Sequence, residues 1–186
     1  MIRCRLFFFL VAAVTFLWVT FCCATIIIPS TLEYMTDFSD TIVIGHVTDK
    51  YSYWEANNIF TNIVIDVDEF VKNSNGESSS LIKLKIPGGK VGDTSSELNG
   101  APLFTVGEKV MLFLKKINDT YFPYGLNYGV YQIFRDDEQN KEFIDGPLFN
   151  YSEHYNLRTM QTVNINEPLG KKELGPFLEG VKKLVK

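Results

Sequence analysis

Hydrophobic residues along this chain are spaced for β-strands over most of its length. Residues 41–49 are β-branched and almost wholly apolar, which is typical of a strand covered on both faces. Gly45 interrupts this run, and a glycine within a strand indicates a bend or bulge of the kind that a small barrel uses at a corner. We therefore predict a buried, bent strand in this region.

Two further segments alternate between apolar and polar residues, the pattern of strands with one buried face. Residues 73–80 between them are rich in Asn, Ser and Gly, so they predict a hairpin loop. The predicted inward positions are Ile63, Ile65, Val67 and Val71 in residues 59–71, and Ile82, Leu84 and Ile86 in residues 81–86.

Later strands follow at similar spacing. Residues 110–114 form another fully apolar run. Residues 128–134 are predicted to pair with residues 142–144 across an acidic turn at 135–141. About five to seven strands at such short spacing predict a mainly β protein, built as a small antiparallel barrel or sandwich.

The C-terminal segment has a different period. Residues from about 170 to 186 place apolar side chains on one stripe of an amphipathic helix. Pro176 falls in the first turn, where proline is tolerated, and lysines at the end match the negative end of the helix dipole. We expect this helix to lie over an open edge of the barrel. The stripe comprises Leu174, Phe177, Leu178, Val181, Leu184 and Val185.

The N-terminus has the pattern of an export signal. Arg3 and Arg5 precede a long apolar run, and small residues then lead to a predicted cleavage before Thr25. This divides the chain into a signal peptide at residues 1–24 and a single domain at residues 25–186.

Two alternatives for this N-terminus stay open. The apolar run, extended by residues 26–28, would serve as an uncleaved membrane anchor. A lipidated Cys22 or Cys23 would tether the protein to a membrane. The three cysteines, Cys4 among them, all precede residue 24, so the domain has no disulfide framework and no four-cysteine zinc site.

Charge and motifs exclude several classes of function. The chain has 18 basic and 22 acidic residues, an acidic balance that argues against nucleic-acid binding. Residues 87–92 contain glycines and Lys90 but lack the spacing of a phosphate-binding loop. Those glycines indicate a tight turn at the end of the third strand.

Catalytic chemistry has little support in the sequence. His46 is predicted to lie on the face of Ile42 and Ile44, as a hydrogen-bonded histidine of the core or of the barrel mouth. His154 is predicted to lie in a polar surface loop. We found neither a zinc-binding helix motif nor a Gly-x-Ser-x-Gly motif. Acidic residues at 66–68 and 136–142 do not match a calcium loop. The sequence therefore predicts a non-enzymatic protein without metal or cofactor, although a hydrolase with a site near His46 stays open.

The strongest candidates for a binding surface are two stretches between strands. Residues 87–108 form a long glycine-rich connection, and loops of this length are uncommon in compact domains unless they are functional. A second predicted loop is dense in aromatic residues. The candidate partner-binding residues are Gly88, Gly89, Lys90, Leu103 and Phe104 in the first, and Tyr51, Tyr53 and Trp54 in the second.

Several motifs together resemble those of a known group. They are Asp40-Thr-Ile-Val-Ile-Gly-His-Val-Thr, then Ile86-Pro-Gly-Gly-Lys-Val-Gly, Gly100-Ala-Pro-Leu-Phe and Val106-Gly-Glu-Lys-Val-Met-Leu-Phe-Leu. This combination, over roughly residues 30–134, resembles exported bacterial proteins of unknown function, some of which occur beside secreted metalloproteases.

The strand order is also similar to OB-like barrels, including the netrin and TIMP-type inhibitor domains. The resemblance implies an OB-like barrel with a C-terminal helix. Those inhibitors present an N-terminal cysteine to a protease zinc and are braced by disulfides. This chain departs from that pattern unless processing stops just before Cys23, so the resemblance implies a fold more than a function.

These observations predict an exported binding module of the periplasm or cell envelope, with a protein or cell-surface partner. One alternative is an inhibitor of a secreted metalloprotease. A second is a membrane-anchored subunit of an envelope assembly.

Overall fold

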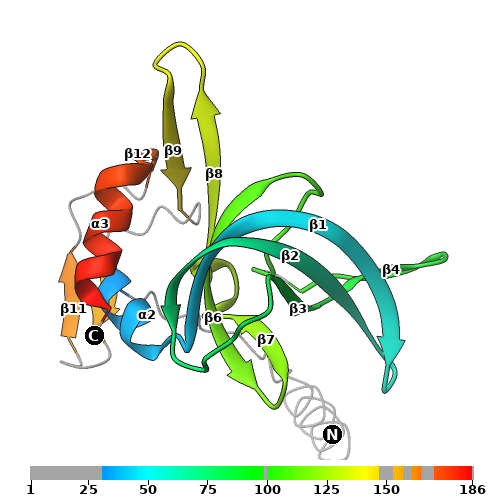
Figure 1. Cartoon of the computed structure of the whole chain (residues 1–186). Helices are drawn as coiled ribbons and strands as arrows, with labels where there is room; N and C mark the ends of the chain where they lie inside the picture. The colour runs from blue at the N-terminus through cyan, green and yellow to red at the C-terminus, as the bar shows by residue number, and fades with distance from the viewer. Residues whose placement is uncertain (1–30, 99, 147–152, 157–160, 165–169, 186) are drawn as a thin grey trace, which may run out of the picture.

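Two long strands form a curved hairpin at the centre of the structure (Figure 1). The computed structural model describes residues 31–98, 100–146, 153–156, 161–164 and 170–185; the predicted signal peptide lies outside these residues. In the hairpin, β1 (Thr41–Glu55) pairs antiparallel with β2 (Asn58–Asn73).

The register of this hairpin explains its bend. Pairing skips Asp68 and Val71 on β2, and each extra residue bulges the strand and reverses the alternation of side chains. Gly45 lies beside the bulge at Asp68, and a Cβ atom on Gly45 would be 2.3 Å from the carbonyl oxygen of Asp66. The predicted bend at Gly45 is therefore confirmed. The predicted inward position of Val71 is wrong, because the bulges turn it away from the face of Val67.

Five strands close into a ring, as expected for an OB-like barrel. In addition to β1 and β2, the ring contains β3 (Leu81–Pro87), β6 (Lys109–Ile117) and β7 (Thr120–Pro123). Its order is β1-β2-β3-β7-β6 and back to β1. All its pairings are antiparallel except that of β3 with β7, which is parallel. Strands make up 54% of the structure, so the mainly β class is confirmed.

The sheet continues beyond the ring. Strands β8 (Val130–Asp136), β9 (Lys141–Asp145) and β12 (Lys172–Glu173) extend it from β6 to eight strands, and the 3-10 helix η1 (Leu126–Gly129) precedes β8. The β8–β9 hairpin projects from the body (Figure 1).

Two small separate sheets correct predictions of loops. Strands β4 (Gly89–Val91) and β5 (Thr94–Ser96) form a hairpin within the segment predicted as one long connection. Strands β10 (Glu153–Asn156) and β11 (Gln161–Asn164) form the other sheet. His154 therefore lies on a strand rather than in a loop. Runs of three or four residues are too short for their periodicity to be recognised.

Two α-helices are present in the described part of the chain. The predicted C-terminal helix is α3 (Leu174–Leu184). The helix α2 (Leu32–Phe38) was not predicted from the sequence. It begins where the Thr31 hydroxyl accepts a hydrogen bond from the Tyr34 backbone N–H at 3.2 Å, the usual role of an N-cap threonine. Within the described residues, no helix combines the length and hydropathy of a membrane span.

The core has two parts because β1 and β6 are buried on both faces. Alternate residues, such as Val43 and Leu112, fill the interior of the ring. Their neighbours, such as Ile44 and Phe113, pack on the outside against both helices. Helix α3 therefore covers the outer face of the sheet rather than an open barrel edge. The apolar composition of residues 41–45 and 110–114 follows from this double burial.

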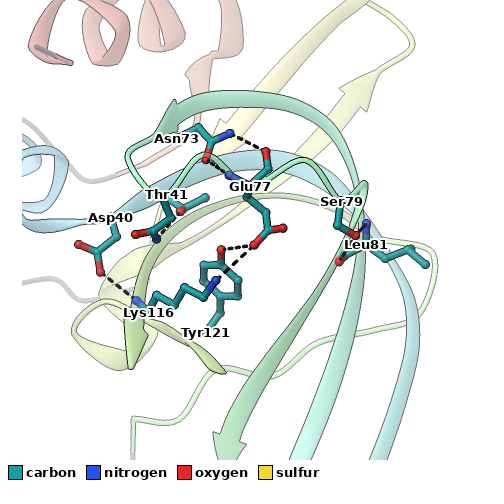
Figure 2. Close-up of polar contacts among 9 residues, drawn as sticks. Asp40, Thr41, Asn73, Glu77, Ser79, Leu81, Lys116 and Tyr121 are labelled. Atoms are coloured by element: carbon teal, nitrogen blue, oxygen red, sulfur yellow. Dashed lines mark hydrogen bonds and ion pairs between the residues drawn. The ribbon is translucent and has the colours of Figure 1, made fainter. Parts of the chain in front are cut away.

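The β2–β3 loop is tied across one end of the ring (Figure 2). The Glu77 carboxylate accepts hydrogen bonds from the Tyr121 hydroxyl at 3.0 Å and from Lys116 Nζ at 3.4 Å. Asn73 holds the loop through two 2.8 Å hydrogen bonds with the backbone of Glu77. The pKa of Glu77 is lowered chiefly by the hydrogen bond from Tyr121 and secondly by a hydrogen bond from the backbone of Ser79. These contacts fix the loop at this end of the ring.

Candidate functional site

A cavity of about 850 Å³ lies at the end of the ring opposite the β2–β3 loop. One wall comes from β1 and β2, through Lys50, Ser52, Thr61 and Ile63. The other comes from the end of β3 and from residues in the range 88–104. This volume is within the range of ligand-binding sites in proteins.

The floor of the cavity is apolar. Ile63, Ile86 and Phe104 line it and belong to the core inside the ring, each with less than 5% of its surface exposed. Leu98 and Leu103 also line the cavity but are 44% and 85% exposed. Exposed leucines beside a cavity are available to a partner, whereas those in a core are not.

Two glycines shape the wall between β3 and β4. Gly88 and Gly89 have φ angles of +95° and +136°, which side chains other than glycine rarely adopt. A Cβ atom on Gly89 would lie 2.3 Å from Thr61 Oγ1 and 2.4 Å from Ser52 Oγ. The predicted tight turn does not lie at these two glycines, since the turn of this segment is at Gly92 and Asp93. Gly88 and Gly89 are instead explained by their positive φ angles and, at Gly89, by the close approach to β1 and β2.

A chain of hydrogen bonds joins Gly88 and Lys90 to the β1–β2 hairpin. Thr61 Oγ1 donates to the carbonyl oxygen of Gly88 at 2.7 Å. The hydroxyls of Ser52 and Thr61 are 2.8 Å apart, and the Lys90 backbone N–H donates to Ser52 Oγ at 3.4 Å. Because the single proton of Thr61 goes to Gly88, the proton between the two hydroxyls comes from Ser52. Both hydroxyl protons are therefore used within the wall.

The charged side chains of the lining are Lys50, Lys90 and Glu97. Lys50 Nζ donates to the carbonyl oxygen of Phe104 at 3.0 Å, which ties β1 to the opposite wall. Among the described residues, no carboxylate forms an ion pair with either lysine. The lining thus has more positive than negative charge.

Of the two predicted groups of partner-binding residues, the structure brings together the one from residues 87–108 and places the aromatic one apart from it. Gly88, Gly89, Lys90, Leu103 and Phe104 all line the cavity.

The aromatic group lies elsewhere. Tyr51, Tyr53 and Trp54 are on β1 rather than in a loop, because β1 continues to Glu55. Tyr51 and Tyr53 face away from the cavity, since side chains alternate along a strand and Ser52 lines it. Trp54 shares the parity of Ser52 and is 52% exposed, but it does not line the cavity.

On the outer face of the hairpin, aromatic and charged side chains pack on one another. Lys85 pairs with Glu55 and lies 4.2 Å from the centre of the Phe60 ring. The hydrogen bond between them lowers the pKa of Glu55 and raises the pKa of Lys85. Tyr53 lies beside Phe60, with ring centres 6.4 Å apart. These contacts stabilise the part of the β1–β2 hairpin that forms one wall of the cavity.

Sequence analysis did not identify Lys50, Ser52 or Thr61 as site residues. Their position depends on a hairpin turn at Ala56 and Asn57, which have φ angles of 45° and 66°. Tight hairpin turns need positive φ angles and favour Asn-Gly or Asp-Gly, so Ala-Asn is a weak signal. With the turn placed there, the register puts Ser52 opposite Thr61.

Of the two environments predicted for His46, a position in the core is wrong. Its side chain is 46% exposed, and Nδ1 lies 3.0 Å from Asp68 Oδ2. The outer core that buries Ile42 and Ile44 does not extend to it. Asp66 and Asp68 point to solvent, as expected for the polar face of β2. Among the described residues, no three or more side chains of His, Cys, Asp or Glu are placed to hold a metal ion.

No protein-family model matches this chain, and no curated protein sequence matches it either.

Proposed function

We propose that this chain is an exported, non-enzymatic binding module that holds a segment of a protein partner in the cavity. The observation that carries the proposal is the cavity itself: a buried apolar floor bordered by the exposed Leu98 and Leu103. An apolar partner side chain that reached this floor would leave water, which is favourable by about 25 cal/mol per Å² of buried apolar surface.

The border of the cavity suits an extended segment. Ser95 and Ser96 of β5 line it, and all residues of β5 are exposed. In the described part of the chain, β5 pairs only with β4. A strand with a free edge can accept a partner strand through backbone hydrogen bonds, while pockets beside it select side chains. The cavity and the edge together provide both components.

The pattern of residues 1–24 supports export to the periplasm or cell envelope. The resemblance to exported bacterial proteins supports the same location.

Capture of the partner tests this proposal. We expect the double variant Lys90→Glu/Leu103→Glu to lose most of its capture from an envelope extract of the cells that produce the chain, measured by quantitative mass spectrometry. Both residues line the cavity, and Leu103 is 85% exposed, so the thermal midpoint should change little.

The matched control is Leu81→Glu/Lys83→Glu. It makes the same exchange of a leucine and a lysine for glutamates, at exposed positions at the start of β3, far from its cavity end. We expect capture to be unchanged. Equal capture by the two double variants would contradict the proposed site.

A further inference from the structure

We infer that the partner segment carries a carboxylate beside an apolar residue, and that Lys50 and Lys90 bind this carboxylate in the cavity. The inference rests on the proposed function and specifies the chemistry of its ligand.

The cavity lining has the opposite charge balance to the whole chain. The whole chain has 22 acidic and 18 basic residues, whereas the lining of the cavity has Lys50 and Lys90 against Glu97 alone. An acidic protein repels anions in general, so a site with excess positive charge selects for them locally. The lack of ion pairs for either lysine among the described residues leaves both ammonium groups available to a ligand.

The hydroxyl donors on the β1–β2 wall of the cavity are already used inside the protein. The hydroxyl protons of Ser52 and Thr61 are used within the wall, toward Thr61 and Gly88. Lys50 uses one of its three N–H donors for the carbonyl oxygen of Phe104. The other two donors of Lys50 remain. The donors left for a ligand include the hydroxyls of Ser95 and Ser96, the free edge of β5 and the ammonium groups of the two lysines. Of these, only the ammonium groups are charged, and their strongest partners are carboxylates.

Lys50 lies where the polar wall of the cavity meets its apolar floor. On β2, Ile63 lies directly opposite it in the strand register. Its ammonium group reaches the backbone of Phe104, whose side chain is only 3% exposed. A carboxylate bound to Lys50 thus lies next to the apolar floor. This proximity favours a ligand with an apolar group next to the acidic one, because the apolar group then leaves water on the floor of the cavity.

Selection from a random heptapeptide library displayed on phage, against the purified exported chain, tests the inference. We expect enriched peptides to contain Asp or Glu next to an apolar residue. Their affinity, measured by fluorescence anisotropy, should fall about tenfold for Lys50→Gln, the expected loss of one charge-assisted hydrogen bond. Lys50→Arg should retain binding, and Glu97→Gln should strengthen it by removing the repelling carboxylate.

Controls separate binding from stability. Lys50 also supports the backbone of Phe104, so thermal unfolding of each variant is measured beside its affinity. Lys83→Gln removes a positive charge from an exposed site outside the cavity, and we expect it to leave affinity unchanged.

The outcomes distinguish the inference from the function on which it rests. One outcome would contradict carboxylate binding but support the cavity as the binding site. In that outcome the enriched peptides lack acidic residues, bind Lys50→Gln as well as the wild type, and bind more weakly to Leu103→Glu. If Leu103→Glu weakened the binding of none of the selected peptides, both the carboxylate and the cavity as the binding site would be contradicted.

Discussion

At the scale of single residues, Gly89 shows how local geometry determines the shape of the site. Its φ angle of +136° lies outside the range favoured by other residues, and its missing side chain lets the backbone approach Ser52 and Thr61. Both properties are needed for the hydrogen-bonded wall of the cavity.

We predict that Gly89→Ala destabilises the protein by about 2–4 kcal/mol, since backbone strain and a steric clash add together. Urea unfolding measures this change. Gly92→Ala is the matched control, because Gly92 also has a positive φ but nothing lies within 4 Å of the position that a Cβ atom would take there. It should cost about 1 kcal/mol. Equal losses would show that contact with Ser52 and Thr61 is unimportant.

Asp40 links the start of β1 to the end of β6. Its carboxylate accepts hydrogen bonds from Lys115 Nζ at 2.9 Å and from the Lys116 backbone N–H at 3.0 Å. Burial alone raises the pKa of Asp40, but these contacts outweigh it, and the net pKa lies below its ordinary value of 3.8.

A lowered pKa in the folded state means that Asp40 stabilises the protein above its ordinary pKa. This contribution is lost as the pH falls through the folded-state value. We predict that Asp40→Asn costs about 1 kcal/mol near neutral pH. The difference from the wild type should shrink below pH 3.8. Urea unfolding across this range measures it, and a difference that stays constant with pH would contradict the assigned role.

Single site residues could be predicted from the sequence where an unusual backbone conformation requires glycine. Gly88 and Gly89 were identified because a long glycine-rich connection is unusual. Lys50 and Thr61 were missed because only the strand register brings them to the cavity. The core position that was one of two predicted for His46 is wrong, since an apolar strand does not reveal where the elements that cover it end.

At the scale of elements, α3 covers the outer face of the sheet and so completes a second core outside the ring. Val181 is fully buried with Ile44, Met111 and Phe113 on the outer face of the ring. Lys182 adds a 2.9 Å ion pair with Glu69 on β2. The helix therefore protects one face of strands whose other face fills the barrel.

We predict that Val181→Ala lowers the free energy of unfolding by about 2 kcal/mol, from lost burial and the cavity left behind. Lys183→Ala, at an exposed position on the same helix, should change it by no more than about 0.5 kcal/mol. Chemical denaturation of both variants measures the two effects. If the losses were equal, the helix would not be packed through Val181.

Long, strongly patterned elements could be predicted from the sequence, whereas short ones could not. The amphipathic stripe of α3 and the apolar run of β6 each extend over several residues of regular spacing. Helix α2 has seven residues, and β4 and β5 have three each. Such short elements depend on capping and on tertiary contacts more than on periodicity.

At the scale of the whole molecule, the two ends of the ring differ. The β2–β3 loop is tied across one end through Glu77 (Figure 2), and the cavity occupies the other. Helix α3 lies on the side of the molecule away from β4 (Figure 1). The outer core under α3 therefore shares no residue with the cavity lining, whereas the core inside the ring supplies the floor of the cavity.

Site-specific photo-crosslinking tests the central claim, that the cavity end binds a protein partner, most directly. A photoreactive phenylalanine analogue replaces Leu103 in one version of the chain and Leu81 in another, each produced in its native cells. Both leucines are exposed, but only Leu103 lines the cavity. We predict a covalent adduct with a defined partner from position 103 and none from position 81. Identical adducts from both positions, or none from position 103, would contradict the account.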